Sequence, residues 1–240
     1  MKVTVGVLLA NGFPVPAPFL ISYSLLQQWM LTGKGNEGRK VQIDSAQVLW
    51  GQDFPVDFAR NRICQLFLDN SDSDYLLFLD ADMTHLPDMP HRLIQHQLDV
   101  VTARYVMRKP PFFSVAMRKV GPGLEDYQAL EKLMPFDDIT GLQPIDAGGA
   151  GALMISRWVL TEIRKKFGDD WFRYQDGQTG LRSRSEDMWF YERVRDVGVQ
   201  PYLDADLRCG HIASFVVDER NHEPYHDAFL RGSDIEGVAV

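Results

Sequence analysis

Tyr75-Leu-Leu-Phe-Leu-Asp-Ala-Asp82 is an apolar run that ends in two carboxylates one residue apart. A run of this length, bounded by polar residues, is typical of a buried strand. Alternate residues of a strand share one face, so Asp80 and Asp82 are expected to project together from its C-terminal end. Ligands of open α/β sheets bind at that end. Two carboxylates there can hold a hard divalent cation, and the cation can hold a diphosphate.

Two other segments carry the same Asp-x-Asp spacing, Asp72-Ser-Asp74 and Asp204-Ala-Asp206. Both lie among polar residues or between short apolar stretches, a composition typical of turns. The spacing alone is therefore weak evidence for a metal site. Only Asp80 and Asp82 end a long apolar run, and this position selects them as candidate ligands.

Strands and helices alternate in the first half of the chain. Apolar runs predict strands over residues 3–10, 41–50, 75–79 and 99–105, and helical spacing predicts helices over residues 19–31, 57–68 and 87–98. Shorter runs predict strands over residues 112–119, 142–146, 152–155, 200–203 and 207–212, with helices over 157–167 and 186–197. We therefore expect one Rossmann-like α/β domain over residues 1–215, with a central mostly parallel sheet flanked by helices, and a polar tail over residues 216–240.

The composition is that of an ordinary globular protein, with 45% hydrophobic and 24% charged residues. A formal net charge of −8 argues against general attraction to nucleic acid, although basic residues between 104 and 119 would allow a local patch. Cys64 and Cys209 suggest neither a zinc motif nor a disulfide framework. No segment has the roughly 18 apolar residues of a membrane helix. Residues 3–10 resemble a first strand more than a signal peptide, so a cytoplasmic protein is the simplest prediction.

Two later segments contain residues suited to a ligand site. Gly148-Gly-Ala-Gly151 lets a ligand approach the backbone closely, but it also suits a tight turn. In Ser185-Glu-Asp187, the serine can cap a helix and the two acids favour its positive N-terminus, which is a complete structural explanation. An acid in that position can also act as a general base that takes a proton from an acceptor hydroxyl.

Histidine and arginine supply the remaining candidates. His211 can be a third protein ligand of a manganese-like ion, or an ordinary polar group at a strand end. His85, His91 and His96 lie on or near a predicted surface helix, where solvation explains them. Arg60 can pair with phosphate or with a carboxylate of the metal site, or it can form a salt bridge on the helix surface.

The order of these motifs resembles that of the GT-A glycosyltransferases, nucleotide-sugar-dependent enzymes with a single Rossmann-like domain. The matching segments are Ala59-Arg-Asn61, residues 75–82, 147–155 and 185–190, and Cys209-Gly-His-Ile212. With the opening strand they span residues 3–212. The likeness is greatest to family-two-type enzymes, including small members from bacteria and bacteriophages. The shared order is more specific than any single motif.

The resemblance implies a role for each matching residue. Asp80 and Asp82 would be the motif that binds the metal, Mn2+ or Mg2+, and the diphosphate of a nucleoside diphosphate-sugar donor, most commonly a UDP-sugar. Asp80 would lie nearer the ribose and Asp82 nearer the metal, with His211 completing the metal site. Ala10 and Asn11 follow the first strand, where this family contacts the nucleoside.

Asp187 would match the second acid of the family's Glu-Asp motif, the base of inverting members, and Arg60 is a candidate for binding the donor phosphates. A late histidine ligand also occurs in retaining members, which lack a simple base here. The stereochemistry is therefore open, and Asp187 could instead bind the acceptor. A glycan, a protein and a modified nucleic acid remain alternatives for the acceptor, with residues 124–141 and the tail as candidate contacts.

Two alternatives belong to other classes. Asp80-Ala-Asp-Met-Thr84 also fits the Asp-x-Asp-x-Thr pattern of haloacid-dehalogenase-like phosphohydrolases, in which Asp80 would be the nucleophile. Those enzymes usually carry the motif on the first strand, whereas here it follows the third predicted strand. Gly168-Asp-Asp170 is better explained as a helix C-cap than as their late acidic motif. A non-catalytic nucleotide-sugar-binding module would keep the fold and lose the metal or the base.

Overall fold

The computed structural model describes residues 1–9, 14–32, 46–51, 55–108, 112–123, 126–176 and 182–213. Ala10, Asn11 and the predicted tail over residues 216–240 lie outside these ranges, so what the sequence predicts for them stays a prediction. No helix in the described part combines the length and the apolarity needed to cross a membrane.

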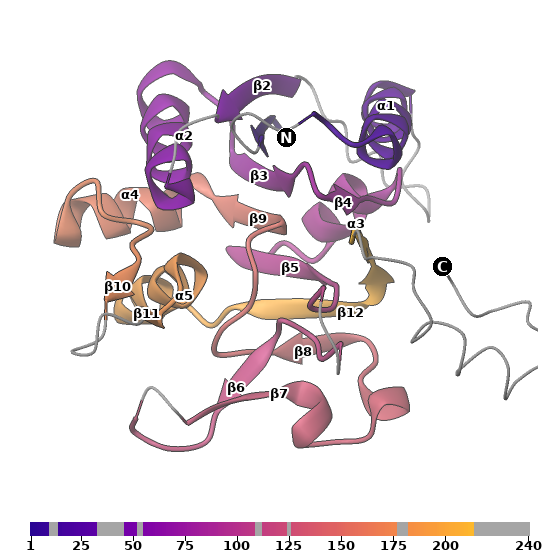
Figure 1. The fold of residues 1–240 in the computed structure, drawn as a ribbon. Coiled ribbons are helices and arrows are strands. Elements are labelled where there is room, and N and C mark those ends of the chain that lie inside the picture. The colour runs from indigo at the N-terminus through magenta and orange to yellow at the C-terminus, as the bar shows by residue number, and fades with distance from the viewer. Residues whose placement is uncertain are drawn as a thin grey trace, which may run out of the picture.

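Helices and short strands alternate along the described chain (Figure 1). The helices are α1 (Ala17–Thr32), α2 (Val56–Asn70), α3 (Met89–Gln95), α4 (Arg157–Phe167) and α5 (Glu186–Asp196), with 3-10 turns η1 (Leu130–Lys132) and η2 (Phe136–Asp138). The strands are β1 (Val3–Leu8), β2 (Ala46–Gly51), β3 (Tyr75–Asp80), β4 (Met83–Thr84), β5 (Val100–Arg104), β6 (Met117–Lys119), β7 (Tyr127–Ala129), β8 (Leu142–Pro144), β9 (Ala152–Ser156), β10 (Gln175–Asp176), β11 (Arg182–Arg184), β12 (Tyr202–Arg208) and β13 (Gly210–His211). Every helix predicted from the sequence is present, and α4 has the predicted ends.

A seven-stranded sheet forms the centre of the molecule, in the order β2-β1-β3-β9-β5-β12-β8. β1 pairs in parallel with β2 and β3, and β12 pairs in parallel with β5. β9 lies antiparallel between β3 and β5, and β8 is antiparallel to β12. The predicted α/β fold with a mostly parallel sheet is confirmed. The alternation of strands and helices did not specify the two antiparallel strands.

Helices cover both faces of the sheet (Figure 1). α2, α4 and α5 pack on one face, and α1 and α3 pack on the other. In β3, Leu76 and Phe78 face the first layer, whereas Leu77 and Leu79 face the second. Asp80 continues the parity of Leu76 and Phe78, so its side chain points toward the layer of α2 and α5.

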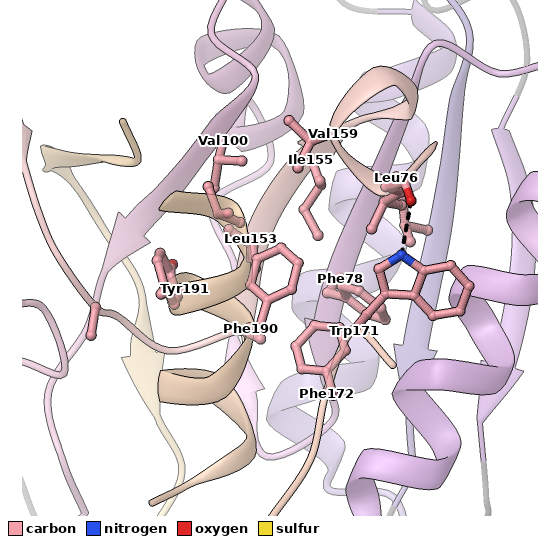
Figure 2. Close-up of a cluster of buried hydrophobic side chains, with 14 of the residues drawn as sticks. Leu76, Phe78, Val100, Leu153, Ile155, Val159, Trp171, Phe172, Phe190 and Tyr191 are labelled. Carbon is pink, nitrogen blue, oxygen red and sulfur yellow. Dashed lines mark hydrogen bonds between the residues drawn. The ribbon is translucent and has the colours of Figure 1, made fainter. Parts of the chain in front are cut away.

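Aromatic rings fill the core between the sheet and the layer of α2, α4 and α5 (Figure 2). Phe172 stacks on Phe190 with ring centroids 4.6 Å apart, and Phe78 meets Phe172 edge-on at 5.6 Å. The indole N–H of Trp171 donates to the backbone oxygen of Leu160 in α4 at 2.9 Å. This hydrogen bond allows the large ring to be buried with its polar atom satisfied.

Asp204-Ala-Asp206 is not the predicted turn. The segment lies within β12, where the pairing register with β5 shifts between Asp204 and Arg208. The Asp204 carboxylate accepts hydrogen bonds from the backbone N–H groups of Asp206 and Leu207, both at 3.1 Å. The acidic residues therefore mark a local irregularity in one continuous strand, which a polarity pattern does not distinguish from a turn.

His85 and His91 are buried, so the prediction of solvated helix-surface side chains is wrong for both. The Nε2 atom of His85 lies 3.4 Å from the backbone oxygen of Asp80, and burial lowers the pKa of this imidazole to about 4. Its ring meets Phe19 of α1 edge-on at 6.1 Å. A neutral imidazole can occupy such an apolar site. The usual polarity of histidine therefore does not indicate a solvent-exposed position for His85.

The basic side chains near residues 104–119 do not form one patch. Arg104 is buried and pairs with Glu131, whereas Arg118 pairs with Asp146 at 3.1 Å. These two charges are paired with separate carboxylates, so they do not act together as one basic patch.

Replacing Trp171 by alanine is expected to lower the free energy of unfolding by about 3–5 kcal/mol, because a buried ring is lost. The backbone oxygen of Leu160 also loses its donor. Urea unfolding followed by circular dichroism measures the change. Trp158→Ala is the matched control: this side chain is 50% exposed, and its loss should change stability by no more than about 0.5 kcal/mol. Equal effects would contradict the packing in Figure 2.

Candidate functional site

Asp80 ends β3 at the C-terminal edge of the parallel strands, opposite Leu8 of β1. Its backbone N–H donates to the oxygen of Gly151 at 3.0 Å. Its carboxylate accepts from Arg60 of α2, with Nη2 at 3.1 Å from both Oδ1 and Oδ2. The strand parity and the α2 layer together fix the direction of this side chain.

Arg60 joins three elements through one guanidinium group. Nη2 contacts Asp80 of β3, while Nη1 contacts Oδ1 of Asp187 and lies 3.4 Å from Oε1 of Glu186, both in α5. The arginine side chain is only 3% exposed. The interpretation as a helix-surface salt bridge is therefore wrong, and the alternative of pairing with a carboxylate of the candidate metal site describes the contact.

The N-terminus of α5 carries the two acids toward Arg60. The Ser185 hydroxyl accepts from the backbone N–H of Met188 at 3.3 Å, which makes the predicted N-cap. The acids favour the helix N-terminus as expected. Their contacts with Arg60 add a tertiary role that the capping pattern alone does not require.

The pKa of Asp187 is raised to about 7. Burial is the largest cause, because a carboxylate loses solvation there; Arg60 opposes it, and the negative charges of Glu186 and Asp80 reinforce it. Burial likewise raises the pKa of Asp80 against the effect of Arg60. One positive group thus faces three acids, and burial together with this excess of negative charge raises the pKa of Asp187 to about 7.

Asp82 lies beyond the end of β3, so strand spacing does not by itself fix the direction of its side chain, although its negative charge helps to raise the pKa of Asp80. β3 ends at Asp80, and the chain turns through Ala81 and Asp82 before β4. Period-two alternation holds only inside a strand. The Asp82 carboxylate instead lies 3.0 Å from Nη1 of Arg108 and 3.6 Å from Nε2 of His211.

His211 reaches Asp82 because β13 pairs antiparallel with β4. The backbone oxygen of Asp82 accepts from the N–H of Ile212 at 2.7 Å. The Nδ1 atom of His211 lies 2.8 Å from the backbone oxygen of Val106, which can only accept, so Nδ1 carries the proton. In the neutral ring, Nε2 then keeps a lone pair directed toward Asp82.

Charge couples the members of this second group. Burial tends to raise the pKa of Asp82, but His211 and Arg108 lower it overall. Burial tends to lower the pKa of His211, but Asp82 and the Val106 oxygen raise it overall. When the ring is protonated, the imidazolium and the Asp82 carboxylate attract each other across 3.6 Å.

The predicted ligand trio is divided in the structure. Within the described residues, no group of three or more His, Cys, Asp or Glu side chains is arranged to hold a metal ion. Asp82 and His211 come together, whereas the Asp80 carboxylate faces Arg60. A carboxylate and an imidazole presenting Nε2 are a chemically suitable incomplete site, which phosphate oxygens or water would have to complete.

The glycine segment lies directly against Asp80 and Tyr105 and is buried throughout. A side chain at Gly151 would place its Cβ 2.4 Å from Sδ of Met83 and 2.9 Å from Oδ2 of Asp80. A Cβ at Gly149 would lie 1.8 Å from the hydroxyl oxygen of Tyr105. Close approach, rather than an unusual turn conformation, explains why glycine occupies these positions.

Tyr105 and Arg108 belong to the site although no motif singled them out. Tyr105 directly follows β5, and its ring meets that of His211 edge-on at 5.7 Å. Arg108 lies three residues further and pairs with Asp82. The usable signal was their place at the end of the strand predicted over residues 99–105 and just after it, because the C-terminal ends of parallel strands carry ligand sites.

No protein-family model and no curated protein matches this sequence. Among solved structures, the chain is similar to A197 from STIV, with 17% identity and a TM-score of 0.54 over 89% of this chain and 87% of that one. It is also similar to GalNAc-T7 in a crystal structure with UDP, GalNAc and Mn2+, with 13% identity, a TM-score of 0.53 and coverage of 89% and 43%. TarS of S. aureus (1–349) gives 12% identity, a TM-score of 0.45 and coverage of 88% and 60%.

The fold is therefore the GT-A fold of glycosyltransferases, as the motif order suggested. At these identities the similarity shows the fold alone. The chain spans less than half of the GalNAc-T7 chain and most of the A197 chain.

Arg60→Leu is expected to cost about 3–5 kcal/mol of unfolding free energy, because three acids lose their buried partner. Without Arg60 the carboxylates have raised pKa values in the folded protein, so the folded state keeps protons that the unfolded chain has already released. The free energy of unfolding therefore falls as the pH rises. The loss should therefore be larger at about pH 8 than at about pH 5. Urea unfolding at both pH values measures it. Arg62→Leu, an exposed position on the same helix, is the control; equal losses would contradict the shared ion pair.

Proposed function

We propose that the protein is a metal-dependent glycosyltransferase that moves a sugar from a nucleoside diphosphate-sugar to an acceptor hydroxyl. The observation that carries this proposal is the pairing of Asp82 with His211, whose Nδ1–H is held by Val106. It lies at the edge of a GT-A sheet where donors bind, and the same edge carries Asp80, whose partner Arg60 also holds Asp187, an acid with a pKa of about 7.

Asp82 and Nε2 of His211 would hold Mn2+ or Mg2+, and the donor diphosphate would supply further oxygen ligands. When bound, the ion stabilises negative charge on the leaving diphosphate. Asp80, fixed by Arg60, would lie nearer the ribose, and Ala10 and Asn11 would contact the nucleoside. UDP is the favoured diphosphate, which the UDP and Mn2+ in the GalNAc-T7 crystal structure support.

Asp187 would be the general base. Arg60 holds its Oδ1 atom, so the carboxylate is oriented without being enclosed, and 23% of the side chain is exposed. The acceptor oxygen forms a bond to the anomeric carbon, the bond from that carbon to the diphosphate oxygen breaks, and the acceptor proton moves to Asp187. Direct displacement of this kind inverts the anomeric configuration; a retained configuration in the product would assign Asp187 to acceptor binding.

The phosphohydrolase alternative requires Asp80 to attack phosphorus. Both of its oxygens accept from Arg60, and the residue lies on the third strand of the chain. A carboxylate held by two such contacts is a poor nucleophile. Turnover of a simple phosphate ester without any response to nucleoside diphosphates would nevertheless favour that activity. A diphosphate response without sugar transfer would favour a binding module.

UDP with Mn2+ should raise the melting temperature of the protein more than either alone, because each completes the binding of the other. Differential scanning fluorimetry measures this effect. Asp82→Ala should abolish the Mn2+-dependent part. Asp72→Ala is the control, since it comes from the same Asp-x-Asp spacing on an exposed turn, and it should leave the shift intact. A full shift in Asp82→Ala would refute the metal assignment.

The transfer rate should rise with pH through about 7, the raised pKa of Asp187, because only the deprotonated carboxylate accepts a proton. Below that pH the rate should fall about tenfold per pH unit. Asp187→Asn should slow transfer about 10²–10⁴-fold while keeping the UDP–Mn2+ shift. Initial rates across pH test this; an unchanged rate and profile in the variant would exclude Asp187 as the base.

A further inference from the structure

Tyr105 touches both halves of the candidate site. Its ring lies edge-on to the imidazole of His211, with centroids 5.7 Å apart and an interplanar angle of 86°. Its hydroxyl oxygen accepts from the backbone N–H of Gly151 at 3.1 Å. The Gly151 oxygen in turn accepts from the N–H of Asp80 at 3.0 Å. One side chain thus links His211 to the strand end that carries Asp80.

The surroundings of this tyrosine are built to its shape. The side chain is 6% exposed. A Cβ at Gly149 would lie 1.8 Å from its hydroxyl oxygen, so the absence of a side chain there makes room for the hydroxyl. The Nδ1–H of His211 is fixed separately by Val106, which restrains the imidazole in its plane. An edge-on ring restrains the remaining rotation of the imidazole.

We propose that Tyr105 is a positioning residue that fixes the orientation of the His211 imidazole, and therefore of its Nε2 atom, relative to the Gly151–Asp80 backbone. The inference rests on the proposed function, in which His211 holds the metal and Asp80 lies beside the donor. The hydroxyl and the ring act separately. The hydroxyl holds the glycine segment in place through its hydrogen bond with Gly151, and the ring orients the imidazole of His211. Contacts that orient a metal-bound histidine affect metal affinity although they never touch the ion.

The hydroxyl stays protonated under ordinary conditions. Burial, and then the negative charges of Asp187 and Asp80, raise the pKa of Tyr105 well above its usual value. The residue is therefore a neutral phenol throughout the range in which Asp187 titrates. Its removal should change binding without moving the pH profile of transfer, which separates positioning from proton transfer.

The chain offers a matched control in Tyr191. This buried tyrosine of α5 also borders the glycine segment, with its hydroxyl 3.4 Å from the backbone oxygen of Gly149. Its ring packs edge-on to Phe190 at 5.6 Å, in the aromatic core. Tyr191→Phe therefore reports the effect of removing a buried hydroxyl near the same glycines.

The test compares Tyr105→Phe, Tyr105→Leu and Tyr191→Phe in the full chain. Tyr105→Phe should raise the donor KM about 2–10-fold, the range for a lost hydrogen bond, with a smaller change in kcat. Tyr105→Leu should also raise the Mn2+ concentration for half-maximal UDP-dependent stabilisation about 10–100-fold. Tyr191→Phe should change both values by less than about twofold.

A second readout needs neither metal nor donor. The His211 ring signals in ¹⁵N–¹H NMR of the metal-free protein should move in Tyr105→Leu, which loses the edge-on ring, and should persist in both phenylalanine variants. Unchanged His211 signals in a folded Tyr105→Leu would overturn the proposal. If the wild type shows no UDP–Mn2+ response, the proposed function fails, and the His211 signals still decide whether Tyr105 positions the imidazole.

Discussion

The buried guanidinium of Arg60 is the interaction on which the candidate site depends. It binds Asp80 at the end of β3 and Asp187 at the start of α5, and thereby ties two elements that are distant in sequence to α2. Without this guanidinium, the two carboxylates would lose hydration in a partly buried site and repel each other. Burial within this arrangement, reinforced by the negative charges of Glu186 and Asp80, raises the pKa of Asp187 to about 7.

A second group of contacts surrounds Asp82 and is built by different elements. The short pairing of β13 with β4 brings His211 to the turn after β3, and Val106 fixes its tautomer. The two groups thus divide the Asp-x-Asp motif: its first acid belongs to a structural ion pair, and its second faces the candidate metal position. Tyr105 and the glycine segment lie between them, where large side chains would not fit.

Local pattern predicted much of the fold. The ends of α4, the cap at Ser185 and the apolar run of β3 follow from rules that involve neighbours in sequence. Burial of polar residues did not follow, because it depends on partners from other elements. The sequence around Arg60 is equally compatible with a surface position, and the polarity around Asp204 predicts a turn although the residue lies in β12.

The sequence by itself determines the candidate site residues and their order along the chain: an apolar strand ending in Asp80, a glycine segment, a capped acidic helix start and a late histidine. Their grouping was decided by tertiary structure. The alternation of side chains along β3 directs Asp80 toward α2 and α5. The turn after β3 places Asp82 near His211. The physical reason is that sequence spacing fixes side-chain direction only within one regular element, whereas the pairing of charges depends on how elements pack.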